Sequence, residues 1–199
     1  MLTAISNLVI ETIKYLGYPG IFLLMTLESV NVPIPSEVIM PFSGFLALQG
    51  NLNFWLVALM GTLGNLAGSF FSYFLAEWII EMRGKSKILS VVISEKHLNK
   101  TDIWFKKYGS FSIFIGRIIP IVRTFISLPA GLGKMEIKKF TILTFLGSFI
   151  WSLFLTYIGF FLGENWTVIE NYFRQMDVII VAAIVLGIAY WLVKMMKKR

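Results

Sequence analysis

The sequence predicts an all-α integral membrane protein, an inverted repeat of a re-entrant helical hairpin plus a transmembrane helix, with an extra C-terminal transmembrane helix. Of its 199 residues, 57% are hydrophobic and only 15% are charged. A soluble domain typically has about 45–50% apolar and about 25% charged residues. Apolar segments follow one another with short gaps. We therefore expect a single membrane domain over residues 1–199.

Residues 1–18 are expected to form a short amphipathic helix at the membrane interface. Ile5, Val9 and Ile13 recur at helical spacing, with polar residues between them. The segment has no basic start and no small-residue cleavage motif, so it does not resemble a signal peptide. An ordinary packed helix is the alternative.

Three apolar segments are expected to cross the membrane. Residues 53–80 carry no charge before Glu77, and residues 140–163 carry none at all. Residues 178–193 form a shorter span with Trp191 as an interfacial anchor.

Small residues within 53–80 predict close helix packing. Gly61, Gly64 and Gly68 recur at a spacing of three and four residues. Asn65 and Tyr73 in the same segment are weaker candidates for lining a cavity.

Basic residues decide the topology of the broken segment 109–133. Of 18 Lys and Arg residues, seven lie in 81–108, three in 134–139 and four in the tail 194–199. All three groups face the cytoplasm only if 109–133 enters the membrane and returns to the same side. We therefore expect a re-entrant hairpin there, and a cytoplasmic C-terminus.

The segment 20–50 is apolar and broken in the same manner. Each broken segment precedes a span, and the two spans are expected to run in opposite directions. Inverted repeats with broken helices are typical of transporters, whose sites lie near the membrane midplane. We therefore expect 20–50 to be a second re-entrant hairpin that enters from the outside, with a kinked full span as the alternative.

Charged residues flank the proline breaks in both hairpins. Glu28 and Glu37 lie on either side of the first break, and Arg117 and Arg123 on either side of the second. If the breaks mark the hairpin tips, the acidic pair meets the basic pair in mid-membrane. The predicted helix breaks are Pro33, Pro35, Pro120 and Pro129.

Four charges inside a bilayer require partners. A lone charge at the bilayer centre costs about 2.5–3.5 kcal/mol or more. The charges must therefore line an interior cavity and pair with one another or with a ligand. The alternative is a buried salt-bridge cluster that only locks the two halves together.

Arginine at a helix start favours a phosphate group as the ligand. Arg123 and Thr124 are expected in the first turn after the proline, where free N–H groups attract anions. Arginine stays charged and binds phosphate through two hydrogen bonds. Ser36 is expected to cap the helix that begins near Glu37.

The residue inventory argues against enzymatic and metal chemistry. The chain has no cysteine, and its one histidine, His97, lies in the basic segment 81–108. No nucleophile or metal-ligating cluster accompanies the glutamates, so we expect no enzyme, no catalytic residue, no cofactor, no metal and no nucleic-acid partner. A membrane enzyme acting on lipid phosphates and a proton-coupled ion or drug antiporter using Glu28 and Glu37 remain competing hypotheses.

The stretch GRIIPIVRTFISLPAG, residues 116–131, resembles the signature of the DedA family, also called the SNARE-associated or VTT-domain family. The E…PxPxE stretch of the first hairpin also fits this family. The resemblance implies a bacterial cytoplasmic-membrane flippase or scramblase for undecaprenyl phosphate or for phospholipids such as phosphatidylethanolamine. It places the essential acids at Glu28 and Glu37 and the essential arginines at Arg117 and Arg123. Because burial favours the protonated form of a carboxylate and nearby arginines favour the charged form, either glutamate is a candidate for proton coupling. Relatives often have Asp at the position of Glu37. A homo-oligomer is left open.

Overall fold

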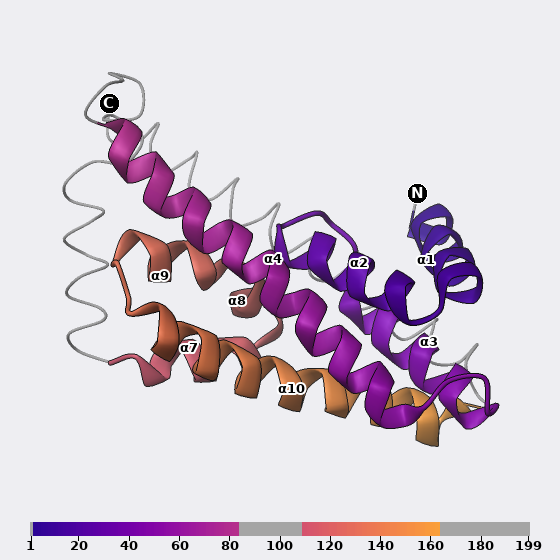
Figure 1. Cartoon of the computed structure of the whole chain (residues 1–199). Helices are drawn as coiled ribbons and strands as arrows, with labels where there is room; N and C mark the ends of the chain where they lie inside the picture. Colours follow the sequence, from indigo (N-terminus) through magenta and orange to yellow (C-terminus); the bar gives the residue numbers. More distant parts are fainter. Residues whose placement is uncertain (1, 84–108, 164–199) are drawn as a thin grey trace, which may run out of the picture.

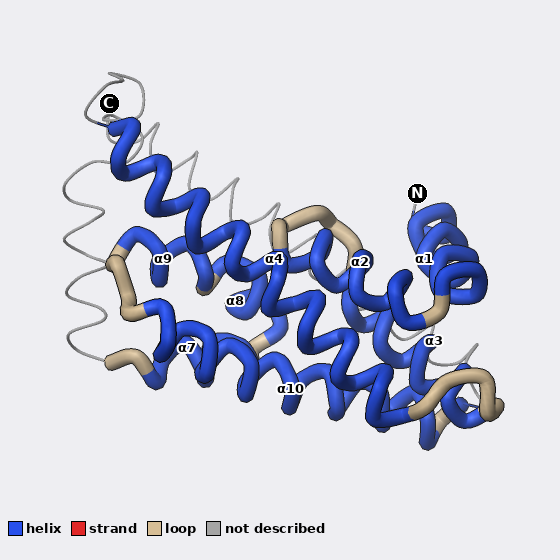
Figure 2. The backbone as a smooth tube through the Cα atoms, in the orientation of Figure 1, coloured by secondary structure: helices blue, strands red, loops and turns tan. Residues whose placement is uncertain are grey.

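The computed structural model describes residues 2–83 and 109–163, and its elements in these two ranges are all α-helices (Figures 1 and 2). The prediction of an all-α protein is confirmed for this part of the chain. In chain order the helices are α1 (Leu2–Leu16), α2 (Tyr18–Ser29), α3 (Ser36–Leu48), α4 (Phe54–Arg83), α7 (Phe111–Ile118), α8 (Pro120–Phe125), α9 (Ser127–Leu132) and α10 (Ile137–Phe161).

Two helices, α4 and α10, are long and apolar enough to cross a membrane, over Phe54–Met82 and Ile137–Phe161. They correspond to the first two predicted spans. The third predicted span (178–193), the tail (194–199) and residues 84–108 of the basic segment lie outside the described residues.

The two long helices lie against each other in opposite directions (Figure 1). Phe54, at the start of α4, packs against Phe160, near the end of α10, with ring centroids 5.4 Å apart. Further along α4, Tyr73 packs against Phe140, near the start of α10, at 4.8 Å. The order of these contacts shows that α4 and α10 are antiparallel.

The helix α2 runs alongside α4 in the same direction. A Cβ atom at Gly64 would lie 2.4 Å from the carbonyl oxygen of Phe22, and one at Gly68 would lie 2.3 Å from that of Thr26. Only glycine permits so close an approach of two backbones. The close helix packing predicted from the spacing of these glycines is therefore confirmed.

The helices α2 and α3 form a hairpin that runs partway along α4 and turns back. Tyr18 is the first residue of α2, and its hydroxyl accepts a hydrogen bond of 2.7 Å from the backbone N–H of Asn53, just before α4. Near the turn, Ser72 of α4 donates to the carbonyl oxygen of Ser29 at 3.1 Å. The chain then returns through α3 to the start of α4.

The second hairpin consists of α7, then α8 and α9. Its far end lies beside α4, because a Cβ atom at Gly131 would lie 2.3 Å from the carbonyl oxygen of Tyr73. The Tyr73 hydroxyl also donates to the carbonyl oxygen of Met135 at 2.6 Å. Each long helix thus packs most extensively on one arm of each hairpin: α4 on α2 and α9, and α10 on α7 and α3.

The helix α1 packs against the first hairpin by its apolar face. Val9 and Ile13 are buried in the same cluster as residues of α2 and α3. Tyr15, on the opposite face, is 90% exposed. The predicted amphipathic pattern is thus used at least partly for packing within the protein.

Candidate functional site

The two hairpins meet at a buried ion pair between Glu28, in the last turn of α2, and Arg123 of α8. The Nη2 group of Arg123 donates to Oε1 of Glu28 and also to the hydroxyl of Ser36. The second carboxylate oxygen of Glu28 accepts a hydrogen bond of 3.1 Å from Ser29. Glu28 is 4% exposed and Arg123 is 2% exposed, so the pair is closed to solvent.

Glu37 reaches this pair only through Ser36. The hydroxyl of Ser36 donates to Oε2 of Glu37 at 3.1 Å while it accepts from Arg123. Glu37 is half-buried and makes no ion pair with any described residue. The expectation that Ser36 caps α3 is wrong. Pro35 is the N-cap, and the Ser36 side chain makes no capping hydrogen bond because it is hydrogen-bonded to Glu37 and Arg123.

Arg117 is held by neutral groups. Its guanidinium donates to Oδ1 of Asn65 at 3.3 Å, to the hydroxyl of Ser127 at 2.6 Å and to the backbone carbonyl of Arg123 at 2.9 Å. The hydroxyl of Ser148 donates to the same Asn65 oxygen at 2.6 Å. Arg117 is 1% exposed and has no carboxylate partner among the described residues.

The four predicted charges are therefore not equivalent. Glu28 and Arg123 come together, whereas Glu37 and Arg117 each lack an ion pair within the described ranges. A buried cation without a counter-charge is costly unless other groups compensate it. The neutral acceptors around Arg117, which are oxygens of Asn65, Ser127 and the Arg123 backbone, supply part of that compensation.

Each arginine also lies against an aromatic ring of α10. The Cζ atom of Arg123 is 5.2 Å from the centre of the Trp151 ring, and that of Arg117 is 5.9 Å from the centre of the Phe140 ring. Both distances fall within the range of cation–π attraction. One face of α10 thus passes beneath both arginines.

The four prolines named from the sequence lie at or near helix interruptions. Pro33 is in the α2–α3 connection, Pro35 directly precedes α3, and Pro120 is the first residue of α8. Pro129 lies in the first turn of α9, where its missing N–H is tolerated. The helix is interrupted three residues earlier, at Ile126.

The remaining sequence candidates have different places. Thr124 follows Arg123 in α8 and is half-buried. Asn65 joins the site directly, through its contacts with Arg117 and Ser148. The Tyr73 hydroxyl bonds to the backbone of Met135 instead of to either arginine.

Four hydrogen-bonding or ring partners of the charged residues were not found from the sequence: Ser29, Ser127, Ser148 and Trp151. A usable signal was present in the predicted span 140–163, where small polar residues recur every four positions. These residues are Thr144, Ser148, Ser152 and Thr156, and all four are buried. Such spacing places them on one face of a helix, turned towards the protein interior.

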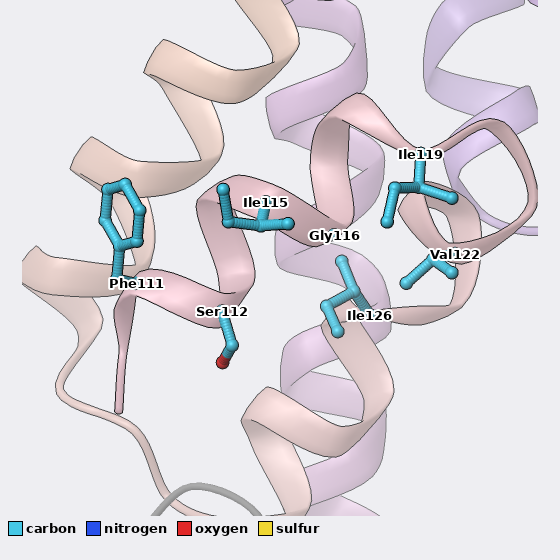
Figure 3. A pocket seen from close by; sticks show the side chains of 7 residues that line it. All are labelled: Phe111, Ser112, Ile115, Gly116, Ile119, Val122 and Ile126. Atoms are coloured by element: carbon cyan, nitrogen blue, oxygen red, sulfur yellow. The ribbon is translucent and has the colours of Figure 1, made fainter. Parts of the chain in front are cut away.

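An apolar pocket of about 380 Å³ lies on the second hairpin, between α7 and the chain that follows it (Figure 3). Neither arginine lines it, although Gly116 and Val122 are their chain neighbours. Its lining residues are Phe111, Ser112, Ile115, Gly116, Ile119, Val122 and Ile126. The same hairpin therefore has a charged interior and a separate hollow suited to hydrocarbon.

Comparison with known proteins identifies similar sequences across nearly the whole chain. The VTT domain family matches residues 34–161. The uncharacterized membrane protein YkoX of Bacillus subtilis is 36% identical over 206 residues, covering 100% of this chain and 90% of the relative. Undecaprenyl phosphate transporter A of Staphylococcus aureus is 30% identical, covering 98% of each chain. An alkaline phosphatase-like protein of Lactococcus lactis is 32% identical, covering 93% of this chain and 88% of the relative. The comparison with solved structures found no match.

Replacing Asn65 by leucine should destabilise the protein, because two buried donors lose their acceptor while the side-chain volume is nearly kept. We expect a loss of about 2–4 kcal/mol in the free energy of unfolding, measured with denaturant in detergent. Ser148→Ala should cost about 1 kcal/mol in the wild type and almost nothing in the Asn65→Leu background. Strictly additive losses would contradict the shared acceptor.

Glu28→Gln should destabilise the protein far more than the matched substitution Glu37→Gln. The first leaves the buried Arg123 without its counter-charge, at a cost of about 3–5 kcal/mol. The second removes no ion pair and should cost under about 1 kcal/mol. The check is the free energy of unfolding of both purified variants, and equal losses would refute the difference between the two glutamates.

Proposed function

The chain belongs to the VTT-domain family of bacterial membrane proteins, also called the DedA family, and from this premise we propose that it is a lipid transporter. It would act as a flippase or scramblase that moves anionic-headgroup lipids across the cytoplasmic membrane. Undecaprenyl phosphate is the proposed substrate, supported by the name of the Staphylococcus aureus relative. Phosphatidylethanolamine or another phospholipid is the alternative.

The observation that carries this proposal is a buried arginine without an acidic partner. Arg117 lies 1% exposed beside two helices that are long enough to span a membrane. A structural lock would need only matched ion pairs, whereas the described residues provide one carboxylate contact for two arginines. A lipid phosphate supplies the missing negative charge and binds arginine through two hydrogen bonds.

We further propose that the two hairpins are re-entrant and related as an inverted repeat. The contacts support this arrangement: the first hairpin starts and ends beside the start of α4, and its turn reaches partway along that helix. The long helices are antiparallel, and each packs on one arm of both hairpins. Transporters of this architecture bind substrate where the repeats meet, near the midplane.

Binding of a headgroup requires the ion pair to open. Arg123 is occupied by Glu28 and Ser36, so a phosphate that reaches Arg123 must displace the carboxylate. A buried carboxylate that loses its counter-charge is stabilised by taking up a proton. This exchange couples headgroup binding to protonation at Glu28, whereas Glu37 takes part only through Ser36.

The hydrocarbon chains of the lipid are expected to stay in the bilayer during transport. The apolar pocket on the outside of the second hairpin offers a surface for such a chain next to the hairpin that carries both arginines (Figure 3). The headgroup then moves inside the protein while the chain follows along its side.

Arg117→Ala and Arg123→Ala should each slow transport of undecaprenyl phosphate in proteoliposomes. Loss of charge-assisted hydrogen bonds to the phosphate predicts a decrease of about tenfold to a hundredfold. The control is Lys139→Ala, which removes an exposed cation at the start of α10. The measured quantity is the initial rate at which labelled lipid becomes accessible on the opposite leaflet.

Other outcomes of this assay would assign a different function. Normal transport rates in both arginine variants would contradict the proposal. Transport of phosphatidylethanolamine but not of undecaprenyl phosphate would replace the proposed substrate by the alternative. Release of inorganic phosphate would indicate a phosphatase, the activity suggested by the name of the Lactococcus lactis relative, and exchange of cations without lipid would indicate an antiporter.

An imposed pH gradient should accelerate transport by the wild type, and Glu28→Gln should abolish this acceleration. Glutamine cannot exchange a proton, so the variant should transport lipid at the same rate with and without the pH gradient. Glu37→Gln is the matched variant and should retain the response to the gradient. A gradient response that survives in Glu28→Gln and disappears in Glu37→Gln would assign the proton to the other glutamate.

A further inference from the structure

Buried hydroxyl groups on the helices of this protein commonly donate to the carbonyl oxygen four residues earlier. Ser43, Thr62 and Thr156 do so at 2.7 Å. Thr144 and Ser152 of α10 are equally buried, at 0% exposed, yet their hydroxyls have no partner among the described residues. Neither hydroxyl donates to the carbonyl oxygen four residues earlier, although the helix offers that acceptor to both. Their hydroxyls are therefore available to another group.

Two further unpartnered groups lie in the same region. The indole N–H of Trp151 and the Nε–H of Arg117 are buried and make no hydrogen bond within the described residues. Neither nitrogen can accept a hydrogen bond, so each needs an acceptor. Leaving buried donors unpaired costs free energy, and native proteins seldom do so without a reason.

Two of these donors, Thr144 and Trp151, lie on the same face of α10. Thr144 lies one turn before Ser148, and a Cβ atom at Gly147 would lie 2.6 Å from the Cβ atom of Arg117. One turn further on, the ring of Trp151 lies beneath Arg123. The Ser152 hydroxyl is turned towards α4, where a Cβ atom at Gly61 would lie 3.3 Å from it. From Thr144 to Trp151 the helix rises by about 10 Å, so this face extends past both arginines.

The chemistry of this face fits an anion. It carries the indole N–H of Trp151 and the hydroxyl of Thr144, and both arginines, including the free Nε–H of Arg117, lie above it. Phosphate oxygens accept several such hydrogen bonds at once. The face is too long for one phosphate group to contact all of it, so a headgroup must meet its donors in succession.

We propose that Thr144 and Trp151 of α10 form a donor face along which the lipid phosphate moves between Arg117 and Arg123. Thr144 acts at the level of Arg117, and Trp151 acts at the level of Arg123. The inference rests on the proposed function and adds to it two residues that contact the headgroup during its passage.

The test uses full-length protein with one donor removed at a time: Thr144→Val and Trp151→Phe. Each should slow transport of undecaprenyl phosphate in proteoliposomes by roughly tenfold, the effect of losing one hydrogen bond to a charged group. Thr144→Val should leave the melting temperature unchanged or raise it, because an unpaired buried polar atom disappears at nearly constant volume. Trp151→Phe keeps a ring beneath Arg123 but loses buried volume, so its melting temperature should fall slightly.

Thr156→Val is the matched control on the same helix. This hydroxyl is also fully buried but already donates to the carbonyl of Ser152. Its removal should lower the melting temperature slightly and leave transport unchanged. Opposite patterns in Thr144→Val and Thr156→Val would separate contact with substrate from a structural role.

A second readout compares undecaprenyl phosphate with uncharged undecaprenol by mass analysis of lipid bound to purified protein. The wild type should prefer the phosphate, and the two donor variants should lose part of that preference. If the wild type transports lipid and the variants match it in rate and preference, the inference is contradicted while the proposed function stands. If the melting temperature of Thr144→Val falls together with transport, the hydroxyl is structural and the inference is also contradicted. If the wild type neither binds nor transports an anionic lipid, the proposed function itself fails.

Discussion

The ion pair between Arg123 and Glu28 is the constraint on which the rest of the structure depends. Charges enclosed between apolar helices are stable only when protein groups replace the lost water. The pair lies where the end of α2 meets α8, so it requires these parts of the two hairpins to lie side by side. Ser29 and Ser36 complete the hydrogen bonding of the two charges.

Close backbone contacts make that meeting possible. The hairpin arms approach the long helices at glycines, where added Cβ atoms would collide with carbonyl oxygens of the neighbouring helix, as at Gly68 and Gly159. In a membrane, helix association depends on such packing because lipid chains are as apolar as the side chains. Between the two apolar clusters of the interior, short polar side chains such as Ser36, Asn65 and Ser127 form hydrogen bonds with the arginines.

Sequence patterns predicted the helices, the broken segments and the charged residues, but not the pairing of the charges. Glu28 and Glu37 flank the first break, and Arg117 and Arg123 flank the second, in nearly symmetrical fashion. In the structure Arg123 takes one glutamate, and Arg117 is held by Asn65 and Ser127. The expected capping role of Ser36 was wrong because its hydroxyl forms hydrogen bonds with Arg123 and Glu37 instead of with the backbone.

Composition, proline positions and charge placement by themselves determined that this is a helical membrane protein with two broken segments and an arginine signature. These properties depend on local preferences and on the cost of charge in lipid, both of which are written in the order of residues. Only the tertiary structure decided that α10 brings Ser148 and Trp151 beneath the arginines, and that Arg117 lacks an acidic partner among the described residues. Those outcomes depend on distances between helices far apart in the chain, which no local pattern specifies.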